Sequence, residues 1–219
     1  MMKMFIVLAV DGGAGTGKST LSNLLSNRKN LLYVETGSHY RALTFMLLQK
    51  DLRPDTVEDY LLENSLSIES NINKNKSEIQ IDGIKFNPED LRSSKVNDNV
   101  SHFAALPVLR KSLLDYQRSQ VNQARSLGFS GVILEGRDIG TKILPAADLK
   151  IFLHADAETR IQRRIKDGEV DSIRKRDELD SNRKSAPLAC AEDALRINTA
   201  DYSAEEVYNL VIKALNSRL

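Results

Sequence analysis

Apolar runs separated by helical patterns make up most of this chain. Residues 5–10, 31–34, 132–134 and 149–153 are almost continuously apolar, and a weaker run spans 194–197. Parallel strands that are covered on both faces have this pattern. Between the runs, apolar residues recur every three or four positions, which is typical of helices packed on a sheet. This alternation predicts an α/β fold of three layers around a five-stranded, mostly parallel sheet.

One segment breaks this rhythm, because apolar and polar residues alternate there. The apolar positions are Leu66 and Ile68, Ile79 and Ile81, and Ile84 and Phe86. A period of two predicts strands with one exposed face. Asp82-Gly83 is a favoured two-residue hairpin turn, and Asn87 followed by Pro88 is a helix start. We therefore expect a small antiparallel sheet inserted into the α/β core. At the other end of the chain, Ser203 and Glu206 predict a capping box.

The first apolar run leads into a glycine-rich stretch. Gly12, Gly17, Lys18 and Ser19 fit the pattern G-x-x-x-x-G-K-S/T between a predicted strand and a predicted helix. Glycines let backbone N–H groups converge on phosphate oxygens, and the helix N-terminus adds partial positive charge. In such a loop Lys18 would bridge the β- and γ-phosphates, and the Ser19 hydroxyl would approach Mg²⁺. The residues predicted to bind a nucleoside triphosphate are Gly12, Gly13, Ala14, Gly15, Thr16, Gly17, Lys18, Ser19 and Thr20.

Composition narrows the possible partners. The chain has 219 residues with 31 basic and 30 acidic side chains, which argues against a nucleic-acid or membrane surface built on bulk charge. The first apolar run is too short to span a bilayer, and Cys190 is the single cysteine, so we expect a cytoplasmic protein. We also expect a monomer. The histidines at 39, 102 and 154 lack metal-ligand spacing and favour packing or surface roles, although His39 stays open because it lies within a polar motif.

Three polar stretches follow predicted strands or a predicted helix. Residues 35–41 follow the second strand, residues 135–141 the third, and residues 176–183 an arginine-rich helix. Arginine is the preferred side chain for bidentate phosphate recognition. Asp138 could accept a hydrogen bond from an exocyclic amine, as carboxylates do from the N4 amine of cytosine. Surface ion pairs are the alternative for any one stretch taken alone.

Together the motifs resemble those of the bacterial cytidylate (CMP) kinases, of the nucleoside monophosphate kinase family. The shared motifs are D-G-x-x-G-x-G-K, T-G-x-x-Y-R, G-R-D-I-G-T and R-D-x-x-D-S-x-R…A-P-L, from about Phe5 to the C-terminus. The resemblance implies transfer of the γ-phosphoryl group of ATP to CMP or dCMP, with Mg²⁺. It also implies a P-loop core at 1–60 and 104–219, a monophosphate-binding domain at 61–103 and a helical lid at about 157–184.

The resemblance also assigns roles to single residues. The acceptor phosphate would be held by Arg41, Arg137 and Arg183. The nucleotide pocket and the cytosine ring would be contacted by Thr36, Tyr40, Ser101, Arg110 and Asp138. The sugar would be reached by Arg176 and Asp180. The lid arginines over ATP would be Arg160, Arg163 and Arg164. The residues acting directly on the transferred group would be Lys18, Arg137 and Arg183.

The chain departs from the family pattern at a few places. Gly13 stands where proline is usual, and Glu35 and Glu135 stand where aspartate is commoner. The lid is also several residues shorter than in many relatives.

The chemistry implied by the resemblance needs no general base, because a nucleoside monophosphate is largely a dianion at neutral pH. Arginine, lysine and Mg²⁺ would stabilise the spread charge and align the two phosphates. A P-loop kinase for another nucleotide, such as UMP, is an alternative. A nucleotide-dependent switch is another, although the guanine-reading motif N-K-x-D is absent from the sequence.

Overall fold

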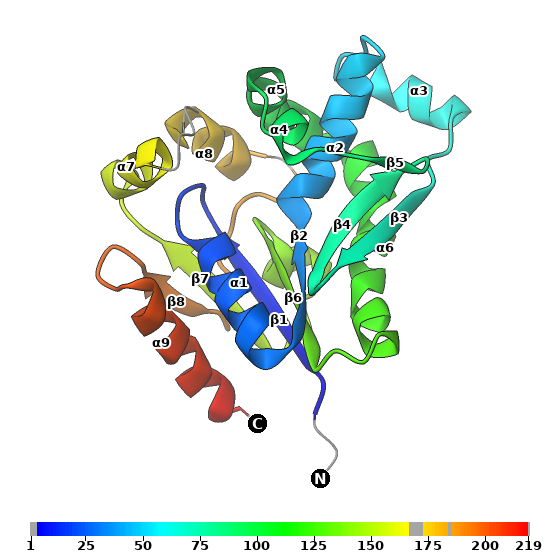
Figure 1. The fold of residues 1–219 in the computed structure, drawn as a ribbon. Helices are drawn as coiled ribbons and strands as arrows, with labels where there is room; N and C mark the ends of the chain where they lie inside the picture. Colours follow the sequence, from blue (N-terminus) through cyan, green and yellow to red (C-terminus); the bar gives the residue numbers. More distant parts are fainter. Residues whose placement is uncertain (1–3, 167–172, 184, 219) are drawn as a thin grey trace.

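A single twisted sheet runs through the molecule and carries helices on both faces (Figure 1). The computed structural model describes residues 4–166, 173–183 and 185–218. Within them the strands are β1 (Ile6–Gly12), β2 (Leu31–Glu35), β3 (Ile68–Asn73), β4 (Lys76–Ile81), β5 (Ile84–Lys85), β6 (Gly131–Gly136), β7 (Leu149–His154) and β8 (Leu195–Asn198). The helices are α1 (Lys18–Lys29), α2 (Thr36–Gln49), α3 (Val57–Glu63), α4 (Pro88–Leu91), α5 (Ser94–Ala104), α6 (Pro107–Ser126), a π-helical turn η1 (Ile139–Ile143), α7 (Ala157–Lys166), α8 (Ile173–Ser181) and α9 (Ala204–Asn216).

The five predicted core strands are confirmed, and all of them are parallel. Their order across the sheet is β2-β6-β1-β7-β8. In the centre, Leu8 of β1 is in register with Ile133 of β6 and Leu149 of β7. Because parallel strands all point the same way, their carboxyl ends meet at one edge of the sheet.

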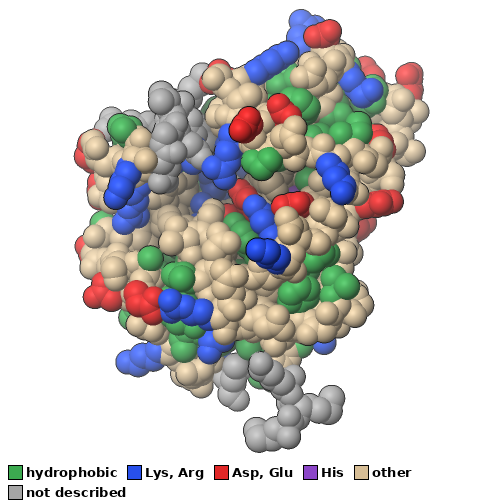
Figure 2. Space-filling view, in the orientation of Figure 1, with side chains coloured by type: hydrophobic (Ala, Val, Ile, Leu, Met, Phe, Trp, Pro, Cys, Tyr) green, Lys and Arg blue, Asp and Glu red, His purple; other side chains and the backbone are tan. Residues whose placement is uncertain are grey.

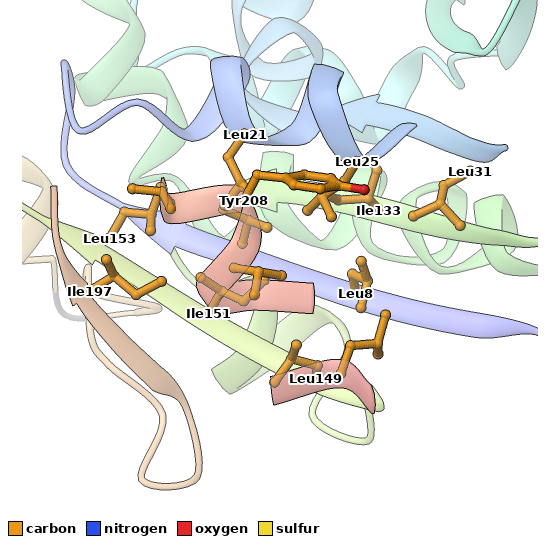
Figure 3. Packing of buried hydrophobic residues seen from close by; sticks show 14 of the residues in the cluster. Leu8, Leu21, Leu25, Leu31, Ile133, Leu149, Ile151, Leu153, Ile197 and Tyr208 are labelled. Atoms are coloured by element: carbon orange, nitrogen blue, oxygen red, sulfur yellow. The ribbon is translucent and has the colours of Figure 1, made fainter. Parts of the chain in front are cut away.

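Alternate residues along these strands face two separate layers, which confirms the three-layer fold. Leu8 and Val10 face α1 and α9, where Leu25 and Tyr208 complete a buried cluster (Figure 3). Ala9 points to the opposite face and packs with residues of β2, β6, α6 and η1. A third cluster joins α2, α5 and α6 to β4 and includes Leu43, Phe103 and Leu109. The continuous apolar runs in the sequence reflect this burial on both faces.

The inserted hairpin extends the main sheet instead of standing apart from it. Strands β3 and β4 pair antiparallel, and β4 pairs antiparallel with β5 across the predicted Asp82-Gly83 turn, whose φ angles are 52° and 75°. β4 also pairs in parallel with β2, through Tyr33–Lys76 and Val34–Ser77. This short parallel contact brings residues of the insertion next to the carboxyl end of β2.

Both predicted helix starts are confirmed. Pro88 is the first residue of α4 after Asn87, whose side chain donates to the Asp90 carboxylate at 3.3 Å. The capping box is complete at α9, where Ser203 Oγ accepts from the Glu206 backbone and Glu206 accepts from the Ser203 backbone. No helix in the described part of the chain is long and apolar enough to cross a membrane.

Gly131→Ala tests how closely β6 packs on β1. A Cβ at this position would lie 2.2 Å from the Ile6 carbonyl oxygen, a backbone atom that is held in the sheet. The free energy of unfolding should fall by about 3 kcal/mol. Gly37→Ala in α2 is the control, because its Cβ would meet nothing within 4 Å and alanine favours a helix by up to about 1 kcal/mol. Urea denaturation compares the two, and equal stabilities would contradict the packing described here.

Candidate active site

A cavity of about 560 Å³ lies at the carboxyl edge of the parallel sheet. Figure 2 shows basic and acidic side chains gathered around a hollow near the middle of the molecular face that it presents. The walls combine the glycine-rich loop with residues that follow β2, β6 and β8, among them Lys18, Glu35, Arg41, Glu135 and Arg137. The topology therefore gathers side chains that are a hundred residues apart in sequence.

The glycine-rich loop is held in a shape that other residues would not allow. Gly12 has a φ of 153°, and a Cβ there would lie 2.3 Å from the Leu153 carbonyl oxygen. Gly15, with a φ of 72°, packs against the backbone of Arg160, where a Cβ would come within 2.8 Å. Lys18 Nζ folds back over the loop and donates to the Gly13 carbonyl at 2.8 Å. The loop therefore packs closely against β7 and α7, and the Lys18 ammonium lies against its backbone.

Two arginines of α7, Arg160 and Arg163, donate to backbone carbonyls of this loop, and Arg163 reaches Gly15 at 3.5 Å. Arg160 donates to the Ala14 carbonyl at 3.1 Å and pairs with Asp177 of α8. Arg163 donates to both the hydroxyl and the carbonyl of Thr199, at 2.9 and 2.7 Å. Arg164 lines the cavity itself. Helix α7 therefore lies directly beside the loop, and its assignment to a lid stays a prediction.

Two of the predicted acceptor arginines reach the cavity. Arg137 donates through Nη1 to the Gly12 carbonyl at 2.9 Å, so it contacts the glycine-rich loop directly. Arg41 of α2 also lines the cavity and donates to the Leu91 carbonyl and to Asn97, each at 2.7 Å. Two arginines from distant parts of the sequence therefore share this cavity with Lys18.

The third predicted arginine, Arg183, does not line that cavity and instead donates to Asp180, which Arg137 also contacts. The Asp180 carboxylate is buried and accepts from Arg137 Nε at 2.9 Å, from Arg183, and from Ser101 Oγ at 3.1 Å. Ser101 and Arg183 border a second cavity of about 610 Å³ between α5 and α8. The side chain of Arg176 lies outside the described residues.

The predicted base-reading residues form a buried pair beside this network. Asp138 pairs with Arg110, whose guanidinium lies 5.3 Å from the centre of the Tyr40 ring. Burial raises the pKa of the Asp138 carboxyl, and Arg110 opposes that rise. Thr36 does not line either cavity: its hydroxyl donates to the Glu135 carbonyl at 2.8 Å and holds the end of β6.

The turn that carries Arg137 and Asp138 is fastened by a residue of β1. Both oxygens of Asp11 accept backbone N–H groups, from Ile139 and Gly140, at 2.7 Å each. Burial raises the pKa of this carboxyl to about 6, against the effect of those two hydrogen bonds. Asp11 therefore positions the turn relative to the loop that begins one residue later.

Two glutamates and one arginine at the cavity were not among the predicted site residues. Ser19 Oγ donates to Glu135 Oε1 at 2.7 Å, and Glu35 is the register partner of Glu135 on the neighbouring strand. Arg92, after α4, also lines the cavity. The sequence could have indicated the glutamates as site residues, since each follows an apolar run that predicts a strand. The signal for Arg92 was weak, because it follows a short helix inside the insertion.

Comparison with known proteins agrees with this geometry. The family model for cytidylate kinase matches residues 8–217. The chain belongs to the cytidylate kinase family. Similar proteins named cytidylate kinase include one from Alkaliphilus oremlandii, 40% identical over 96% of this chain and 98% of its own length. Another, from Clostridium botulinum strain Langeland, is 37% identical over 94% of this chain and 95% of its own length.

Solved structures support the fold at low sequence identity. A protein from Thermus thermophilus has a TM-score of 0.51 and 16% identity, covering 99% of both chains. An uncharacterised protein from Eubacterium ventriosum has a TM-score of 0.51 and 15% identity, covering 97% of this chain and 98% of that one. The family assignment confirms the resemblance carried by the motifs, and with it the prediction of a nucleotide-binding transferase of the nucleoside monophosphate kinase type. A kinase family implies ATP as the nucleotide.

His39, which the sequence left open, is a buried residue of α2 that lines neither cavity. Its ring packs against Tyr116, with the two centroids 5.1 Å apart. Neither ring nitrogen has a hydrogen-bond partner among the described residues. Burial lowers the pKa of His39 to about 3. A packing role therefore accounts for this histidine.

His39 should make the fold sensitive to acid. Because its folded pKa is about 3 and the unfolded value is about 6.5, the unfolded chain takes up the proton first. Stability is complete above pH about 6.5 and is lost as the pH falls toward 3, by about 2 kcal/mol between pH 7 and pH 5. His39→Leu should lack this loss. Urea titrations at both pH values test it, and an unchanged stability difference between wild type and variant would contradict it.

Proposed function

We propose that this enzyme transfers the γ-phosphoryl group of ATP to CMP or dCMP, giving ADP and CDP or dCDP. The observation that supports the proposal is the shared cavity, whose walls include Lys18 of the phosphate loop together with Arg41 and Arg137 of the acceptor motifs. A kinase for an uncharged metabolite would not need arginines on the acceptor wall. The family to which the chain belongs supports the choice of a cytidine nucleotide.

The donor triphosphate would lie along residues 12–20, with backbone N–H groups and Lys18 on its oxygens. Lys18 already reaches across the loop to Gly13, so a short rotation of its side chain exchanges that carbonyl for a phosphate. Arg164, on the wall of the cavity, is placed to meet the donor from the α7 side. Charge developing on the transferred group would then be opposed by Lys18 and by Arg137.

Mg²⁺ fits the oxygen atoms at the floor of the cavity. The Ser19 hydroxyl and the Glu135 carboxylate lie 2.7 Å apart, and Glu135 Oε2 is buried without a hydrogen-bond partner among the described residues. Oxygen ligands of this kind are those that Mg²⁺ prefers. Ser19 and Glu135 would hold the ion, directly or through water. When bound, the ion supplies positive charge to the phosphates.

The acceptor phosphate would be held by an exchange of partners. Arg137 and Arg183 each donate to one oxygen of Asp180, whereas a phosphate dianion carries more charge and can accept bidentate hydrogen bonds from a guanidinium. As the arginines turn toward the phosphate, Asp180 becomes available to accept from the ribose hydroxyls. The phosphate oxygen that attacks needs no general base, since it is already deprotonated near pH 7.

Cytosine would be selected by Asp138. A carboxylate accepts from the N4 amine of cytosine, whereas uracil presents a carbonyl oxygen at that place, and a mismatch at a buried polar site costs a few kcal/mol. Arg110 and Ser101 would complete the contacts with the ring. UMP as the main acceptor remains the second candidate, because the phosphate-binding arginines do not distinguish it from CMP.

The division into a core at 1–60 and 104–219, an insertion at 61–103 and a lid at about 157–184 is part of this proposal. Closure of the insertion and the lid would exclude water, so that ATP is not hydrolysed. The cytoplasmic location and the monomeric state stay predictions.

The test is a coupled ADP-release assay with Mg·ATP and each of CMP, dCMP, UMP, AMP and GMP. We expect strong turnover with CMP and dCMP and weak turnover with UMP. Absence of turnover with every monophosphate would contradict the acceptor assignment. If the protein bound ATP but no monophosphate increased the release of ADP, the alternative of a nucleotide-dependent switch would be favoured.

Asp138→Ala should narrow the preference for CMP over UMP. Removing the carboxylate loses the hydrogen bond to the amine and the clash with the uracil carbonyl, so the ratio of kcat/KM values should fall by about tenfold or more. Asp193→Ala is the control, because that carboxylate also pairs with a basic side chain, Lys150, but lies away from the cavity walls. An unchanged CMP-to-UMP ratio in Asp138→Ala would exclude Asp138 as the discriminating residue.

A further inference from the structure

Lys76 brings a positive charge from the inserted hairpin to the carboxylates of the phosphate cavity. Its Nζ donates to Glu35 Oε2 at 3.2 Å, where both side chains are partly shielded from solvent. The position is set by the sheet, because Lys76 is in register with Tyr33 in the short parallel contact between β4 and β2. The ammonium also lies 5.6 Å from the centre of the Tyr33 ring. Sheet pairing and ring contact thus fix this charge beside Glu35.

The carboxylates at this point repel each other. Glu35 and Glu135 are register partners on adjacent parallel strands, so their side chains lie on the same face. Glu135 is buried, so water screens its charge from Glu35 only weakly. Both residues line the cavity that also holds the phosphate loop. Two uncompensated negative charges there would oppose the entry of a nucleotide triphosphate.

The two carboxylates are held by different partners. Ser19 of the phosphate loop donates to Glu135, whereas Lys76 of the hairpin donates to Glu35. Lys76 therefore draws Glu35 toward the insertion and leaves the Ser19–Glu135 pair undisturbed. It also neutralises one of the two negative charges on this wall of the cavity.

We propose that Lys76 is a positioning residue for phosphoryl transfer, which acts by neutralising and orienting Glu35 next to the donor phosphates. This inference rests on the proposed function and deepens it, because it links the inserted hairpin to the donor side of the site. If Lys76 acts through Glu35, replacing Lys76 should lower kcat/KM only in an enzyme that still carries the Glu35 carboxylate. A double-mutant cycle tests this dependence directly.

The experiment compares Lys76→Met, Glu35→Gln, the double variant and Lys76→Arg. Lys76→Met should lower kcat/KM for ATP, at saturating CMP, by about tenfold, mainly through a higher KM, because one charge pair beside the donor has been broken. Lys76→Arg should stay within about twofold of wild type. The double variant should match Glu35→Gln within about twofold. Lys85→Met, an exposed lysine of β5 on the same hairpin, is the control and should have no effect.

Calorimetric titration with Mg·ADP gives a second readout that does not depend on turnover. Lys76→Met should weaken binding by about tenfold, and Glu35→Gln should remove that penalty. The inference would be overturned if the losses in kcat/KM or in Mg·ADP affinity of the two single variants multiplied in the double variant. It would also be overturned if Lys76→Met and Lys85→Met had the same kcat/KM and the same affinity. Failure of wild type to phosphorylate any monophosphate would instead contradict the proposed function, and the Mg·ADP titration would still decide the role of Lys76.

Discussion

The parallel hydrogen-bond ladder that joins β1, β6 and β2 is the constraint on which the rest of the structure depends. It holds Asp11 beside Gly136 and Glu35 beside Glu135, so that all three strands end at the same edge. β1 leads into the phosphate loop, β2 leads into the helix that carries Arg41, and β6 leads into the turn that carries Arg137. Ligands of open parallel sheets bind at this edge because neighbouring connections separate there. A slip of one residue would turn the glutamates to the other face and remove them from the cavity.

Pairing of arginines with buried carboxylates is a second feature of the site. Arginines that would hold an acceptor phosphate are paired with carboxylates of the chain: Arg137 and Arg183 with Asp180, and Arg110 with Asp138. Buried charges are costly without a partner, so these pairs stabilise the positive side chains in the structure. Under the proposed function, binding of the acceptor phosphate would exchange one anion for another, which costs less than bringing unpaired arginines together. The Lys76–Glu35 pair is more exposed than these pairs, and its proposed role rests on its position beside the cavity.

Local patterns predicted much of the fold and only part of the site. The five apolar runs, the Asp82-Gly83 turn and the Ser203 capping box carry their information within a few neighbouring residues, and all are present in the structure. The parallel contact between β4 and β2 was not predictable, because it involves two pairs of residues far apart in sequence. For the same reason the meeting of Ser101, Arg137 and Arg183 on Asp180 could not be anticipated. Lys76 carried no local signal at all, since an isolated lysine in a hairpin is ordinarily a solvated residue.

The central claim is that one edge of the sheet aligns a donor triphosphate with a cytidine monophosphate. The most direct test is a crystal structure of the protein with a molecule in which adenosine and cytidine are joined through five phosphates. The account predicts that the phosphate chain runs from Lys18 and Ser19 to Arg137 and Arg41, with the cytosine amine against Asp138. A structure in which the adenosine half occupies the loop while the cytidine half lies away from Arg137 and Asp138 would contradict it.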